Sequence, residues 1–101
     1  MRMMLTAIMP NEPFNTLVRE NKVGTLMGRI LQDLKPEASY FTEEHGKRAL
    51  VLIIDVADPS RFPAFAEPFF LLFDAECRFR MVMTDADLAA SGLEVLAKKW
   101  H

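Results

Sequence analysis

The stretch RALVLIIDVADP, residues 48–59, decides the organisation of this chain. Seven of its first nine residues are apolar with no alternation, and four of its apolar residues are β-branched. This pattern is typical of a strand that is buried on both faces, so we place it in the middle of a sheet. Residues 2–9 also carry apolar side chains at both odd and even positions. They predict a second central strand, because alternate side chains of a strand point to opposite faces.

The segment between these two strands predicts two helices and an edge strand. Asn11 is the expected N-cap of the first helix, and the apolar positions change sides near residues 19–24. We therefore expect a break at residues 21 and 22, and a second helix that ends at Leu34 before a proline. A strand over residues 38–43 then leads through the turn EHG, residues 44–46, into the central strand.

Two prolines complicate the helix that follows the central strand. Ser60 is the expected N-cap, because Pro63 then falls in the first turn, where its amide would have no partner. Pro68 is expected to kink or divide the helix over residues 64–68. The phenylalanines between Phe62 and Phe73 share one helical face and are interpreted as core.

The last part of the chain predicts an edge strand and a closing helix. Residues 76–83 alternate between apolar and polar side chains, which is typical of a strand with one wet face. Thr84 and Asp87 have the spacing of a capping box. The closing helix is expected to place four apolar residues on one face, namely Ala89, Leu93, Leu96 and Trp100.

The order of elements, β-α-β-β-α-β-α, predicts one α+β domain over residues 1–101 with the ferredoxin-like, split βαβ arrangement. Its four-stranded antiparallel sheet would have the helices on one face. The other face would expose an apolar patch larger than a monomer normally tolerates. We therefore expect a homodimer that forms through this sheet face.

Composition restricts the classes of partner. The formal net charge is −2 and no block of Lys or Arg is present, which argues against nucleic acid. The central strand has aliphatic residues where an RNA-binding sheet needs aromatic and basic ones. No segment is apolar for long enough to cross a membrane, and the single cysteine forms no internal disulfide. We expect a cytoplasmic protein without membrane contact, and the spacing of His, Cys and carboxylate residues predicts no metal or cofactor.

Two stretches, KPEASYF at residues 35–41 and DPS…AEPFF at residues 58–70, carry a resemblance. With the order of elements, they resemble small uncharacterised bacterial proteins of the dimeric α+β barrel, ferredoxin-like superfamily. The resemblance implies a homodimer whose two sheets face each other. Some members of that superfamily are cofactor-free monooxygenases, some bind haem, and many have no known activity. No motif of this chain matches a haem-binding or monooxygenase member residue by residue.

The candidate site residues are few. Tyr40 and Asp55 form the pair that could face one cavity between the sheet and the helices. For Asp55 the favoured alternative is a cap on the turn over residues 56–60. Four further residues are ligand-binding candidates, namely His45, Glu67, Arg78 and Arg80. Each has a structural alternative: a turn residue for His45, a local role beside Pro68 for Glu67, and a solvated edge or an ion pair across the dimer for the arginines.

These observations leave two functions open. The first is a homodimeric domain that binds a small apolar or aromatic molecule between sheet and helices. The alternative is a cofactor-free enzyme, monooxygenase-like or isomerase-like, that acts in the same pocket. Whether the protein is an enzyme is not decided by the sequence.

Overall fold

The computed structural model describes all residues, 1–101. The strands and helices follow one another in the predicted order, and five α-helices accompany four strands. The elements are β1 (Arg2–Met9), α1 (Asn11–Arg19), α2 (Val23–Leu34), β2 (Ala38–Glu44), β3 (Lys47–Asp55), the short 3₁₀ helix η1 (Pro59–Arg61), α3 (Phe62–Phe73), β4 (Glu76–Met81), α4 (Asp85–Ala90) and α5 (Leu93–Lys99).

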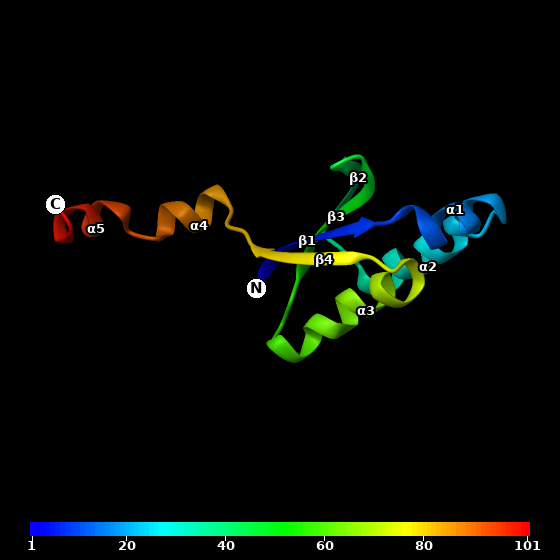
Figure 1. Cartoon of the computed structure of the whole chain (residues 1–101). Helices are drawn as coiled ribbons and strands as arrows, with labels where there is room; N and C mark the ends of the chain where they lie inside the picture. The colour runs from blue at the N-terminus through cyan, green and yellow to red at the C-terminus, as the bar shows by residue number, and fades with distance from the viewer.

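The four strands form one antiparallel sheet in the order β2-β3-β1-β4. The two strands that the sequence places in the centre, β1 and β3, are indeed the central ones. Helices α1, α2 and α3 lie on one side of the sheet (Figure 1). This α+β arrangement is compatible with a ferredoxin-like fold.

The core fills the layer between the sheet and these helices. From the strands, Leu5, Leu50 and Leu52 point toward the helices and are completely buried. From α3, Phe69 and Phe73 meet them and are also completely buried. Burial of one such side chain is worth about 1.5 to 3 kcal/mol, so this layer holds the body of the molecule together.

Two predicted turns are confirmed. The chain passes from α1 to α2 through Asn21, whose φ of 58° is left-handed. The β2–β3 hairpin turns through His45 and Gly46, which both have a positive φ, 51° and 79°. Two consecutive left-handed residues match the right-handed twist of the paired strands, which favours glycine at the second position.

The expected N-cap of the first helix was wrong. Pro10 occupies the cap position, and Asn11 provides no capping hydrogen bond. Glu12 has extended dihedral angles and precedes a cis peptide bond to Pro13. The Glu12 carboxylate accepts hydrogen bonds from the amide and the hydroxyl of Thr16. The Glu12 carboxylate thus accepts from an amide near the start of the helix, which is the kind of role expected of Asn11.

The cap expected for α3 was also wrong, and so was a division of the helix at Pro68. The Asp58 carboxylate accepts a hydrogen bond from the Ser60 amide and so caps η1, while the Ser60 hydroxyl donates to the same carboxylate. Because η1 ends at Arg61, α3 begins afresh, and Pro63 still falls in its first turn. Helix α3 then continues as one helix through Pro68 and is not divided there.

The closing segment differs from the prediction in two ways. Strand β4 ends at Met81, and the single expected helix is divided into α4 and α5 at Gly92, whose φ is 77°. The capping box is confirmed: the Thr84 hydroxyl accepts from the Asp87 amide, and the Asp87 carboxylate accepts from the Thr84 amide.

Residues 84–101, here called the C-terminal arm, extend away from the body of the molecule, residues 1–83 (Figure 1). The molecule is therefore elongated, with principal extents of 60 × 28 × 20 Å. Neither arm helix has a buried residue. None of the helices combines the length and the apolar character needed to cross a membrane.

Candidate functional site

The sheet face away from the helices, here called the open face, carries most of the predicted site residues. Strand pairing aligns one residue from each strand in a row across this face: Tyr40, Val51, Thr6 and Arg78. Aligned residues of neighbouring strands lie on the same side of a sheet. The core leucines at positions 50 and 52 point the other way, so this row faces away from the helices.

The neighbouring row has the same design. It contains Ala38 on β2, Ile53 on β3, Met4 on β1 and Arg80 on β4. The two rows together make an apolar floor in the middle of the sheet, with the tyrosine at one edge and two arginines at the other. The side chains of Met4, Val51 and Ile53 are only partly buried, so this floor is accessible.

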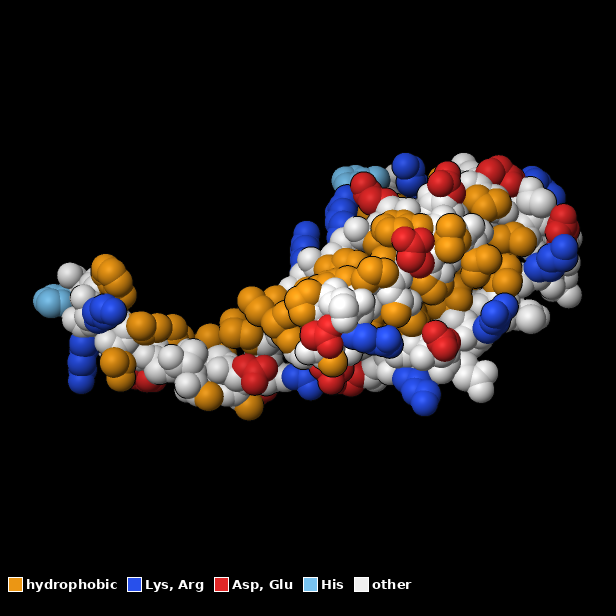
Figure 2. Space-filling model, turned by 90° about the horizontal axis from the view of Figure 1, so that it is seen from below, with side chains coloured by type: hydrophobic (Ala, Val, Ile, Leu, Met, Phe, Trp, Pro, Cys, Tyr) orange, Lys and Arg blue, Asp and Glu red, His pale blue; other side chains and the backbone are white.

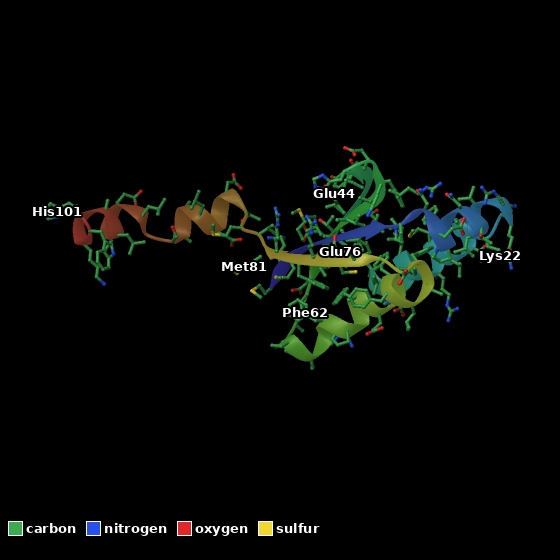
Figure 3. The ribbon with its side chains drawn as sticks, in the orientation of Figure 1. Lys22, Glu44, Phe62, Glu76, Met81 and His101 are labelled. Carbon is green, nitrogen blue, oxygen red and sulfur yellow. The ribbon has the colours of Figure 1, made fainter.

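The two arginines differ in their electrostatic surroundings. Arg78 lies between Glu44 and Glu76, and its guanidinium nitrogens are 3.4 Å from each carboxylate. These glutamates lie on the side of the sheet opposite Phe62 and α3 (Figure 3). Arg80 forms no ion pair. An unpaired guanidinium beside an apolar floor is suited to bind a carboxylate, sulfonate or phosphate.

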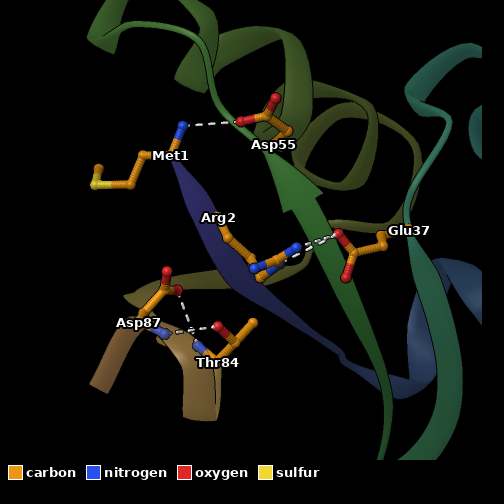
Figure 4. A network of polar contacts seen from close by, with 6 residues as sticks. All are labelled: Met1, Arg2, Glu37, Asp55, Thr84 and Asp87. Carbon is orange, nitrogen blue, oxygen red and sulfur yellow. Dashed lines mark hydrogen bonds and ion pairs between the residues drawn. The ribbon is translucent and has the colours of Figure 1, made fainter. Parts of the chain in front are cut away.

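Asp55 has a partner that the sequence did not indicate. The N-terminal ammonium of Met1 is 2.8 Å from its carboxylate (Figure 4). This hydrogen bond, together with the positive charge of the ammonium, lowers the pKa of Asp55 below its usual value. Nearby, the Arg2 guanidinium binds Glu37 at 3.0 Å, and Glu37 raises the pKa of Arg2.

The structure does not bring Tyr40 and Asp55 together. Both lie on the open face, but Tyr40 is aligned with Val51, four residues before Asp55 on the same strand. Four strand residues span about 13 Å, which is too far for the two side chains to act on one atom. Nor does Asp55 cap the following turn, because Asp58 does so.

Glu67 and His45 lie elsewhere. Glu67 lines a groove of about 630 Å³ between α2 and α3, on the outer surface of the helical layer. His45 occupies the left-handed turn of the β2–β3 hairpin, and its ring is 4.0 Å from Glu44. No group of three or more His, Cys, Asp or Glu side chains comes together in a way that could hold a metal ion.

Cys77, the only cysteine, faces the helices and is half-buried. Burial, reinforced by the charges of Glu67 and Glu76, raises the pKa of its thiol to about 11. The thiol is therefore protonated at neutral pH and is a poor nucleophile.

Sequence reasoning missed the groove between α2 and α3. A signal was present, since Arg29 and Asp33 lie one helical turn apart on α2, and Glu67 and Leu71 do so on α3. Each pair marks one outward face. Which helix faces pack side by side depends on the tertiary structure, so the groove could not be derived from either helix alone.

No protein-family model, no curated protein and no solved structure matches this chain. The functional argument therefore rests on the geometry described above.

Proposed function

We propose that the protein is a homodimer that pairs through its open faces and binds a small apolar or aromatic molecule between the two sheets. The observation that carries this proposal is the apolar floor with a lone arginine at its edge. The molecule would carry a negatively charged group that binds Arg80. This position differs from the layer between sheet and helices, because the core occupies that layer.

The apolar floor supports the dimer. Met4, Val51 and Ile53 leave part of their side chains in water, and Tyr40 is 63% exposed beside them. A second sheet stacked on this face at about 10 Å would remove these side chains from water. Such burial is favourable in proportion to the apolar area removed, at about 25 cal/mol per Å².

The edges of the floor support the ligand. Binding sites for small molecules combine apolar walls with a few polar groups that set orientation. Here the polar groups are the Tyr40 hydroxyl at one edge and the Arg80 guanidinium at the other. Thr6, in the centre of the floor, adds a hydroxyl between them.

The dimer is tested with Ile53→Lys, which places a charge in the middle of the open face. Val18→Lys is the matched control, since Val18 is an exposed β-branched residue on α1, in the helical layer. Light scattering should give a dimer for the parent and for Val18→Lys, and a folded monomer for Ile53→Lys. A parent that is monomeric at micromolar concentration contradicts the dimer.

The ligand is tested with 1-anilinonaphthalene-8-sulfonate, a flat aromatic molecule with one sulfonate. We expect saturable binding, weakened about tenfold by Arg80→Gln, because a hydrogen bond to a charged group is worth about 1.5 to 3 kcal/mol. Arg61→Gln, on η1 in the helical layer, should leave the affinity unchanged. Equal affinity of the parent and Arg80→Gln contradicts the assigned role of Arg80.

A further inference from the structure

The C-terminal arm, residues 84–101, carries apolar side chains that have nothing to pack against in the chain. Its large apolar residues are between 43% and 76% exposed, namely Leu88, Leu93, Val95, Leu96 and Trp100. They stand free of the body as far as His101 (Figure 3). Leu93, Leu96 and Trp100 recur at spacings of three and four residues, so they form one face of α5, and Val95 lies on the opposite face.

The size of the molecule shows how much surface this arm leaves uncovered. The radius of gyration is 17.1 Å, whereas a compact chain of about 100 residues has a value near 13 Å. The accessible surface is 7125 Å², whereas a compact monomer of this mass exposes about 5,800 Å². Covering the excess of roughly 1,300 Å² on each of two chains would bury an area typical of obligate dimers.

The groove between α2 and α3 offers a complementary surface. Its apolar lining consists of Ile30, Pro68, Leu71 and Leu72. In the last turn of α3, Leu71 is 79% exposed and its neighbours Phe70 and Leu72 are 42% and 36% exposed, so these side chains form an apolar patch. Apolar side chains run along the arm and continue across the adjoining face of the body (Figure 2). An amphipathic helix that lies in such a groove buries its apolar face at evenly spaced positions.

The charges of arm and groove are also complementary. The groove contains the carboxylates of Asp33 and Glu67 and one cation, Arg29, so its net charge is negative. The ion pairs of the chain include neither carboxylate. The last turn of α5 contains Lys98 and Lys99, which likewise form no ion pair. Exposed ion pairs add little affinity, but they fix the direction in which a docked helix lies.

We propose that two copies of this chain exchange their C-terminal arms, so that the arm of each copy lies in the α2–α3 groove of the other. The arm leaves the end of the body opposite α2, and it points away from its own groove (Figure 1). The arm can enter the groove of a second copy without folding back on its own body. A two-fold axis between the copies then forms both arm–groove contacts at once. This inference rests on the homodimer proposed above. The groove lies on the helical side of each copy, away from the open face, so the arm has to turn past the edge of the partner's sheet to reach it.

The test is chemical crosslinking of the full chain carrying Gln32→Cys in the groove, Ala97→Cys on the apolar face of α5, and Cys77→Ser. A short bismaleimide should join the two introduced thiols between chains and give a covalent dimer. The single tryptophan gives a second measurement, because Trp100 emission should be that of a buried side chain in the dimer.

Two variants of the arm separate docking from random collision. Leu96→Asp puts a charge on the docking face, and Val95→Asp puts the same charge on the opposite face of the same helix. The covalent dimer should be lost in Leu96→Asp and retained in Val95→Asp. Because the arm makes no structural contribution to the body, both variants should fold, which circular dichroism checks.

The other outcomes overturn the inference. A crosslink within one chain means that the arm folds back on its own body, and no crosslink with a solvent-exposed Trp100 means that the arm is free. In either case a dimer by light scattering leaves the proposed homodimer intact. A parent that is monomeric by light scattering overturns both.

Discussion

Helices α3 and α4 are held in place by opposite means. Helix α3 has a proline in its interior and no side-chain cap of its own, yet four of its residues are buried. Helix α4 has both hydrogen bonds of a capping box and no buried residue. The comparison separates two roles of sequence: local signals decide where a helix begins, whereas burial decides where it lies and how firmly it is held.

The largest difference between the two regions should appear when side chains are truncated. Phe69→Ala in α3 should lower the free energy of unfolding by about 3 to 5 kcal/mol, because it leaves a cavity in the core. Val95→Ala in the arm should change it by less than about 0.5 kcal/mol. Urea denaturation monitored by circular dichroism measures both. Similar losses for the two variants would contradict the division into a packed body and an unpacked arm.

The same division explains which elements could be predicted. Strands β1 and β3 were predicted because burial on both faces leaves an apolar run with no alternation. The start of α3 was not, because the choice of Ser60 as its cap assumed a single helix, whereas η1 and α3 are separate. The break at Gly92 was hidden, because the apolar positions 89, 93, 96 and 100 keep helical spacing across it.

The site was predictable only as far as side-chain parity allowed. Parity places Tyr40, Arg78 and Arg80 on one side of the sheet once the register is known. The separation of Tyr40 and Asp55 depends on the register of β2 against β3. No feature of the nearby sequence indicates that register. The partner of Asp55, the amino group of Met1, lies 54 residues away in sequence, so nothing near Asp55 indicates it.

Removing the proline within α3 should stabilise the body of the molecule, the opposite of the effect of Phe69→Ala. Pro68 cannot donate to the Ala64 carbonyl, and an interior proline costs about 3 kcal/mol relative to alanine. Since Phe69 and Phe73 are already buried in an undivided helix, Pro68→Ala need not reorient them. We expect a higher melting temperature for Pro68→Ala and little change for Pro63→Ala, in the first turn. A lower melting temperature for Pro68→Ala would show that the proline positions the phenylalanines.

Thiol reactivity compares the two regions without changing the fold. With a pKa of about 11, Cys77 should react with Ellman's reagent at pH 8 roughly a hundredfold more slowly than an ordinary thiol. A thiol introduced in the arm by Ser91→Cys, with Cys77→Ser, should react at the ordinary rate. Because only the thiolate reacts, the rate for Cys77 should rise as the pH approaches 11. Equal rates at pH 8 would contradict the burial of Cys77.

The smallest expected effect concerns the capping box. Thr84→Ala removes the hydroxyl that accepts from the Asp87 amide, and the loss of such a cap costs about 1 kcal/mol of helix stability. That cost should fall on α4 alone: its amides should exchange hydrogen faster, while the urea midpoint of the body stays unchanged.

The capping box should also depend on pH. The hydrogen bonds from Thr84 lower the pKa of Asp87, so the stability that the box contributes is complete above the pKa of an unfolded aspartate and is lost as the pH falls through the lowered value. Acidification should therefore reproduce the faster exchange of α4 in the parent. It should do so to the same extent in Thr84→Asn, whose side-chain oxygen can still accept from the Asp87 amide. If Thr84→Ala lowers the urea midpoint of the body as well, the arm supports the body, and the two regions are one folding unit.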